Sequence, residues 1–151
     1  MELTLKELRE LVLTWAKIKG INNPDNQYLK CIEEIGETAG AILKGKREDI
    51  LNEIGDIAVT VIILYWQKNK FISDKIYTYD TEDEYSVEEK RTAIQQILLD
   101  LDEQDESILD SIELLAVMHN SDLVECLTLA WNKIKNRQGK TVDGTFIKSA
   151  Q

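Results

Sequence analysis

Four acidic side chains occur in two copies of one short pattern, and their types and spacing could support chemistry. The first copy is Glu34-x-x-Glu37 and the second is Glu53-x-x-Asp56. In a helix, residues three apart lie on the same face, one turn from each other, so each copy presents a pair of carboxylates. Four such charges on facing helices repel one another strongly unless a cation lies between them. The pattern therefore indicates a cation site.

Divalent cations that prefer oxygen are expected at such a cluster, because carboxylate oxygens are hard ligands. We predict that Mg²⁺, or Mn²⁺ in its place, is bound by Glu34, Glu37, Glu53 and Asp56. Such a metal binds phosphate oxygens and lowers the pKa of a bound water. Glu33 and Glu37 are the candidate catalytic residues that would orient or deprotonate this water. The alternative is an ordinary solvated helix face, but the recurrence of the pair among apolar residues favours the metal.

The elements that position these acids are predicted from the apolar residues on either side of them. Apolar residues at helical spacing predict helices over residues 3–20, 24–44 and 48–70. The link Gly45-Lys46-Arg47 is short, so the third helix should return antiparallel to the second. The two copies of the acidic pattern are then carried on adjoining helices.

The rest of the chain predicts three more helices and two irregular segments. Capping residues and apolar spacing place the helices over residues 87–101, 107–118 and 121–139. The acidic stretch Tyr77–Tyr85 has no helical periodicity and is predicted to be an exposed loop. The tail, residues 140–151, is predicted to be irregular.

The two acidic segments also resemble each other, because residues 33–37 and 52–56 align at a shift of 19 positions. Each copy contains a glycine at the same place, Gly36 and Gly55. A glycine within a helix costs about 1 kcal/mol relative to alanine. We therefore expect close backbone approach beside the acids, although a match this short can also arise by chance.

The C-terminal part is electrically unlike the rest of the chain. Residues 129–148 contain five basic residues and one acidic residue, in a chain of formal net charge −10. A basic helix end and tail near a carboxylate–metal cluster would suit a polyphosphate ligand. The alternative is that these cations only complement the helix dipole, but the basic run continues past Gly139, where the dipole effect has faded.

Composition bounds the class of protein. A chain of 151 residues with 43% hydrophobic and 30% charged residues is typical of one globular domain. The negative net charge argues against a nucleic-acid partner. The longest apolar run, Ile57–Trp66, is about half of what crossing a bilayer requires, which argues against a membrane partner. Two cysteines, Cys31 and Cys126, and an N-terminus without signal-peptide features predict a cytoplasmic protein.

The paired motif, with fifteen residues between Glu37 and Glu53, resembles the signature of the all-α nucleoside triphosphate pyrophosphohydrolases, and within them the MazG-like branch. The resemblance covers about residues 8–66 and 121–148. Its flanking motifs are Trp15–Ile21, Glu33–Glu37, Ala41–Gly45, Glu125–Lys140 and Asp143–Lys148.

The resemblance implies one all-α domain, an antiparallel helical bundle of the pyrophosphohydrolase type. This chain departs from the family pattern between the two matching stretches, where a two-helix insertion is expected before the last helix. The core would cover about residues 3–69 and 121–139 and the insertion about 70–120. The implied activity is Mg²⁺-dependent hydrolysis of a nucleoside triphosphate (NTP or dNTP) to the monophosphate and pyrophosphate. The alternative is a non-catalytic helical module of the same fold that binds a nucleotide or a regulatory partner.

Substrate contacts are expected from the basic end of the chain and from one aromatic ring. The candidates to hold the triphosphate are Lys133, Lys135, Asn136, Arg137 and Lys140. Among these, the match to the family pattern favours Lys135 and Asn136. Trp15 could stack on the base, although a tryptophan on an apolar stripe is more often part of a core.

Self-association is expected because residues 56–66 and the face around Trp131 carry more apolar surface than one small bundle covers. We predict a homodimer or homotetramer. The interface residues are expected among Ile57, Val61, Leu64 and Tyr65.

Overall fold

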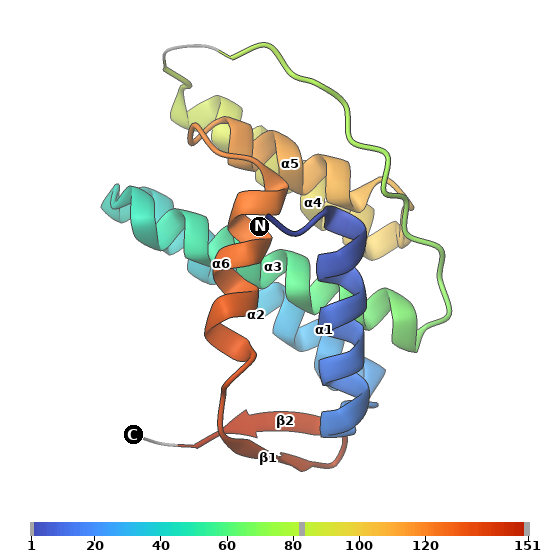
Figure 1. The fold of residues 1–151 in the computed structure, drawn as a ribbon. Helices are drawn as coiled ribbons and strands as arrows, with labels where there is room; N and C mark the ends of the chain where they lie inside the picture. The colour runs from blue at the N-terminus through green and yellow to red at the C-terminus, as the bar shows by residue number, and fades with distance from the viewer. Residues whose placement is uncertain (1, 82–83, 150–151) are drawn as a thin grey trace.

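The computed structural model describes residues 2–81 and 84–149, and within them it contains six helices and one two-stranded sheet (Figure 1). In chain order the elements are α1 (Leu5–Lys19), α2 (Pro24–Lys44), α3 (Arg47–Gln67), α4 (Val87–Glu103), α5 (Ile108–Val117), α6 (Leu123–Ile134), β1 (Gly139–Val142) and β2 (Thr145–Lys148). The predicted all-α helical bundle is confirmed, and α4 and α5 are the two helices that precede the last one.

The pair α2–α3 is set by signals at the ends of its helices. The Asn23 side chain accepts a hydrogen bond from the Asn26 amide and caps α2, with proline in its first turn. At the other end, Gly45 adopts the left-handed conformation, with φ of 76°, which ends the helix. Helix α3 begins two residues later and packs along α2. The short link thus returns α3 antiparallel to α2, as predicted.

Helix α3 lies at the centre of the molecule, in contact with α1, α2, α5 and α6. The predicted interface residues Ile57, Val61, Leu64 and Tyr65 are all at most 1% exposed within a single chain. The prediction that they form an interface between copies is therefore wrong. A helix that is apolar on every side is a core helix when other helices surround it, and here the other elements of the same chain supply that cover.

The insertion shares this core and does not form a separate unit. Helices α4 and α5 pack on each other, and α5 also contacts α3 and α6. The segment 68–86 contains no helix or strand where it is described and runs along the outside of the bundle (Figure 1). Two hydrogen bonds attach this segment to α5: the Tyr77 amide and the Tyr79 hydroxyl both donate to the Asp110 carboxylate, at 2.9 and 2.5 Å. The predicted exposed loop also includes Glu82 and Asp83, which lie outside the described residues.

The tail differs from the prediction, because it forms a β-hairpin. Helix α6 ends at Ile134, and β1 and β2 pair antiparallel with Val142 opposite Thr145. The two turn residues, Asp143 and Gly144, both have positive φ, at 51° and 76°. This is the conformation that two-residue hairpin loops require, and Asp-Gly is a favoured sequence for it. Residues 150 and 151 of the predicted tail lie outside the described part of the chain.

The hairpin is attached to the link between α1 and α2. The amides of Asn22 and Asn23 both donate to the carbonyl oxygen of Gly144, at 2.9 and 3.3 Å. The Asn23 side chain donates to the carbonyl of Asp143 at 2.9 Å, and the Asn26 side chain to the Thr145 hydroxyl at 2.8 Å. Figure 1 shows the hairpin across the ends of α1 and α6, where it closes one end of the molecule.

The close approach expected at the two repeated glycines is confirmed at one of them. A Cβ placed on Gly55 would lie 2.1 Å from the carbonyl oxygen of Cys126 on α6. A Cβ placed on Gly36 would have no neighbour within 4 Å. The prediction is therefore right for Gly55 and wrong for Gly36, because only α3 has another helix against its glycine.

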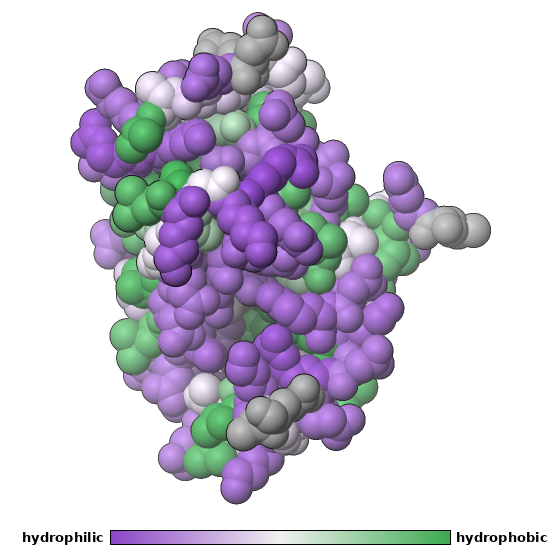
Figure 2. Space-filling view, turned by 90° about the vertical axis from the view of Figure 1, so that its left-hand side faces the viewer, coloured by the Kyte–Doolittle hydropathy of each residue, from purple (hydrophilic) through white to green (hydrophobic). Residues whose placement is uncertain are grey.

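Among the residues that the structure describes, no helix has both the length and the apolar character needed to cross a membrane. The face seen in Figure 2 is mostly hydrophilic, with hydrophobic side chains exposed in smaller patches.

Candidate metal centre

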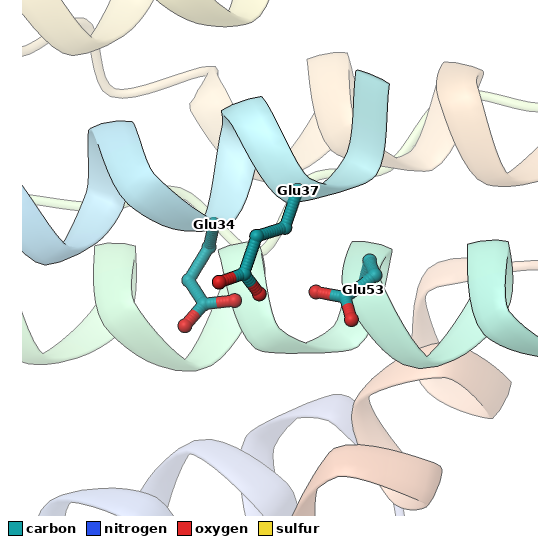
Figure 3. Close-up of side chains that lie close together, drawn as sticks. All are labelled: Glu34, Glu37 and Glu53. Atoms are coloured by element: carbon teal, nitrogen blue, oxygen red, sulfur yellow. The ribbon is translucent and has the colours of Figure 1, made fainter. Parts of the chain in front are cut away.

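Three of the four predicted metal ligands meet between α2 and α3. Glu34 and Glu37 extend from α2 toward α3, and Glu53 extends from α3 toward Glu37 (Figure 3). One carboxylate oxygen from each residue lies within 4.8 Å of the others. The antiparallel pairing brings together acids that are 16 residues or more apart in the chain, as the repeated spacing predicted.

The environment of these carboxylates is unfavourable without a cation. Oε2 of Glu34 and Oε2 of Glu53 are enclosed, and neither has a hydrogen-bond partner. Buried polar atoms in folded proteins are nearly always partnered, and an unpartnered charged oxygen is costly. Two such oxygens in one cluster of hard ligands fit a divalent cation, which would supply both with a partner.

Burial and the closeness of the carboxylates also raise the pKa values of two glutamates in the cluster. Burial, followed by the charges of Asp56, Glu37, Glu53 and Glu33, raises the pKa of Glu34 to about 8. Burial, followed by the nearby Asp56 and Glu37, also raises the pKa of Glu53. A bound metal ion would have the opposite effect and lower these pKa values, because a cation favours the charged form of its ligands.

The fourth predicted ligand, Asp56, lies beside the cluster but has a partner of its own. Lys133 on α6 donates to Asp56 Oδ2 at 2.7 Å. The Asp56 side chain is 17% exposed and that of Lys133 is 39% exposed. Lys133 of α6 therefore occupies a carboxylate that the sequence predicts to be a metal ligand.

The cluster opens into a pocket of about 700 Å³ between α1, α2, α3, the end of α6 and the hairpin. The lining includes all five acids of the prediction, together with four basic side chains and two aromatic rings. These residues are Glu33, Glu34, Glu37, Glu53, Asp56, Lys30, Lys133, Arg137, Lys148, Trp15 and Phe146. Acids, bases and apolar rings thus border one cavity.

Glu33, one of the two candidate catalytic residues, lies at the pocket but outside the three-carboxylate cluster. Its carboxylate pairs with Lys30 at 3.2 Å, one turn earlier on α2. Glu37, the other candidate, belongs to the cluster and is exposed to the pocket.

The predicted phosphate-binding residues divide into two groups. Lys133 and Arg137 line the pocket, as does the predicted base-stacking residue Trp15. Lys135, Asn136 and Lys140 are exposed and do not line it. The chain turns after Ile134 from α6 into the hairpin, so successive residues there point in different directions. Lys135 instead donates to the Asn132 side chain at 3.0 Å.

Two hairpin residues that line the pocket, Phe146 and Lys148, were not named as substrate contacts in the prediction, which named Lys140 of the hairpin instead. The Phe146 ring contacts the Trp15 ring edge to face, with centroids 5.2 Å apart, and Lys19 lies 5.6 Å from the Phe146 ring. Lys148 brings a further cation to the pocket lining. A signal was present in the sequence, because Asp143-Gly144 between β-branched and aromatic residues is typical of a hairpin.

Comparisons with known proteins find little that is similar. No protein-family model matches this chain, and no solved structure matches it significantly. The chain is similar to an uncharacterized 18.2 kDa protein in the rep-hol intergenic region of Haemophilus phage HP1, with 31% identity over 68 residues. The match covers 43% of this chain and 42% of the phage protein, so it spans less than half the length of that relative.

Proposed function

We propose that this protein hydrolyses nucleoside triphosphates, NTP or dNTP, to the monophosphate and pyrophosphate in the presence of Mg²⁺. The observation that carries the proposal is the carboxylate cluster of Glu34, Glu37 and Glu53, with its two enclosed and unpartnered oxygens. The cluster borders the same pocket as Lys133 and Arg137. A hard metal site next to basic side chains is the combination that a polyphosphate needs. The resemblance of the paired motif to MazG-like pyrophosphohydrolases supports the same activity.

Glu34, Glu37 and Glu53 are the residues that would hold Mg²⁺, and Asp56 would complete the set when it is released from Lys133. Bound Mg²⁺ neutralises charge on phosphate oxygens and lowers the pKa of a bound water. Mn²⁺ prefers the same oxygen ligands and could substitute.

The chain's own residues have distinct roles in this proposal. Lys133 and Arg137 bind the phosphate oxygens and balance the charge that develops on the leaving pyrophosphate. Glu37, exposed to the pocket, accepts the proton of the water that attacks the α-phosphorus. The bond from this phosphorus to the bridging oxygen then breaks, and pyrophosphate leaves with the electron pair. Glu33 serves less well as the base because it is paired with Lys30.

The test is to incubate the protein with a panel of NTPs and dNTPs plus Mg²⁺ and to measure pyrophosphate. We expect release from the unmodified protein and a loss of about a hundredfold or more in Glu37→Gln and in Glu53→Gln. Glu48→Gln is the matched control, because Glu48 is an exposed acid on α3 that does not line the pocket. The helical circular dichroism of all three variants should be unchanged.

The alternative function is a non-catalytic module that binds nucleotide or a partner with the same fold. It predicts tight nucleotide binding in the presence of Mg²⁺ and no pyrophosphate from any member of the panel. Retained turnover in both Glu37→Gln and Glu53→Gln would remove these residues from the mechanism.

A further inference from the structure

Gln27 is a buried polar side chain in the wall of the pocket, two turns before Glu34 on α2. It is 6% exposed, and its Nε2 donates to the carbonyl oxygen of Thr60 on α3 at 3.1 Å. A backbone carbonyl can only accept, so this bond fixes which end of the amide is nitrogen and which is oxygen.

The other end of the amide is free. Within the described part of the chain, no group donates to Gln27 Oε1, and this oxygen is not among the enclosed polar atoms that lack a partner. Gln27 lines the pocket, so a ligand in the pocket is the group that could donate to this oxygen. The amide nitrogen of Gln27 is already hydrogen-bonded, and its oxygen can only accept. A ligand beside Gln27 must therefore offer a hydrogen-bond donor.

The position of Gln27 suits contact with the base of a nucleotide. It is seven residues from Glu34, which corresponds to about 10 Å along the same face of a helix. This is comparable to the span from the phosphate next to the ribose to the far edge of a base. The pocket lining also includes the apolar side chains of Ile21 and Ile63, which suit an aromatic ring.

We propose that Gln27 Oε1 accepts a hydrogen bond from the exocyclic amino group that cytosine carries at C4 and adenine at C6, so that the substrates are cytosine or adenine nucleotides. The proposal rests on the proposed function, because phosphates near the carboxylates are what bring the base to Gln27. A uracil or hypoxanthine base carries a carbonyl oxygen where cytosine or adenine carries the amino group. That oxygen would face the Gln27 oxygen with no proton between them, which a buried site disfavours.

The test compares nucleotides that differ at this one group, CTP with UTP and ATP with inosine triphosphate. We expect kcat/KM of the unmodified protein to favour the amino member by at least about tenfold in the pair whose ring size the pocket admits. Gln27→Met removes the acceptor and keeps the length of the side chain. It should bring the ratio close to one, mainly by raising KM for the amino member.

Gln67→Met is the matched control. Gln67 is also a glutamine whose Nε2 donates to a backbone carbonyl, that of Ile21 at 3.2 Å, but it does not line the pocket. This variant loses a comparable internal hydrogen bond. If Gln27 acted only through its hydrogen bond to the backbone, Gln67→Met would change the nucleotide preference in the same way. We expect Gln67→Met to retain the preference for the amino member.

Each outcome decides a separate question. Equal hydrolysis of both members of each pair by the unmodified protein would overturn the role of Gln27 and leave the proposed function intact. This comparison needs no variant, so it holds even if Gln27→Met does not fold. If no nucleotide releases pyrophosphate, the proposed function fails, and equilibrium binding of CTP and UTP with Mg²⁺ then decides on Gln27. Equal affinity for the two would overturn its role.

Discussion

At the scale of single residues, Glu34 couples the candidate site to pH. Its pKa in the folded protein is about 8, raised first by burial and then by neighbouring carboxylates, against 4.5 for an ordinary glutamate. Between these values the folded state holds a proton that the unfolded state has lost. By linkage, the stability that this group contributes is fully present below about pH 4.5 and is lost as pH rises through about 8.

We therefore predict that the metal-free protein melts at progressively lower temperature as pH is raised from 5 to 9. Glu34→Gln should melt higher than the unmodified protein at pH 9 and flatten this part of the profile, because the amide carries no charge. Thermal unfolding followed by circular dichroism in a chelating buffer measures both. Added Mg²⁺ should reverse the loss at high pH. A profile identical in the two proteins would contradict the pKa of Glu34.

Lys133 has two proposed roles that can be separated. It holds Asp56 in an ion pair, and it borders the pocket where phosphates would bind. We predict that Lys133→Met binds Mn²⁺ severalfold more tightly without nucleotide, because Asp56 is freed and a positive charge is removed. With nucleotide, KM should rise by about tenfold, the typical cost of losing a charged hydrogen bond.

Lys135→Met is the control for Lys133, since this exposed lysine bonds Asn132 and does not line the pocket. Its Mn²⁺ affinity, read from paramagnetic resonance of the free ion, and its KM should both stay near those of the unmodified protein. A larger effect from Lys135 than from Lys133 would favour the sequence-based choice over the geometry of the pocket.

At the scale of elements, the contact between α3 and α6 depends on Gly55. We predict that Gly55→Ala destabilises the protein by about 2 kcal/mol or more, because its Cβ would overlap the Cys126 carbonyl and force the helices apart. Gly36→Ala, at the same place in the other copy, meets no neighbour and should add up to about 1 kcal/mol through helix propensity. Urea denaturation of the two variants gives both values, and equal effects would contradict the packing.

The helices were predictable because their signals are local. Apolar spacing, caps and the short link at Gly45 specify α2 and α3, and with them the meeting of Glu34, Glu37 and Glu53. The ion pair of Asp56 with Lys133 was not predictable, since its partners are 77 residues apart and meet only because α6 packs on α3. Periodicity shows which face of a helix is apolar but not which helix will cover it.

The hairpin was missed for a different reason. Its strands are four residues long and contain lysines, so the tail was interpreted as an irregular basic segment, and the turn sequence within it was not used. Asp143-Gly144 does predict the turn, yet nothing local shows that the turn binds Asn22 and Asn23. The contribution of Phe146 and Lys148 to the pocket follows from that long-range attachment.

At the scale of the whole molecule, self-association remains a prediction, and a different face of the molecule is now expected to carry it. The apolar surface of α3 is used within one chain, as the burial of Ile57 and Val61 shows. Exposed apolar side chains remain on α2, where Leu29, Ile32 and Leu43 share one side of the helix. Leu29 also lines the pocket, so a second copy on this side would lie beside the candidate site.

We therefore expect a homodimer or homotetramer in which this side of α2 is covered, and Leu43 is the residue with which to test it. Leu43 is 82% exposed and lies at the end of α2 away from Gln27, so Leu43→Glu places a charge in the interface without entering the pocket. Light scattering after size exclusion should show a smaller species than the unmodified protein, with unchanged helical circular dichroism. Phe71→Glu, which alters a similarly exposed residue outside α2, should leave the mass unchanged. A monomer at micromolar concentration before any substitution would refute association, whereas an oligomer that withstands Leu43→Glu would place the interface on another face.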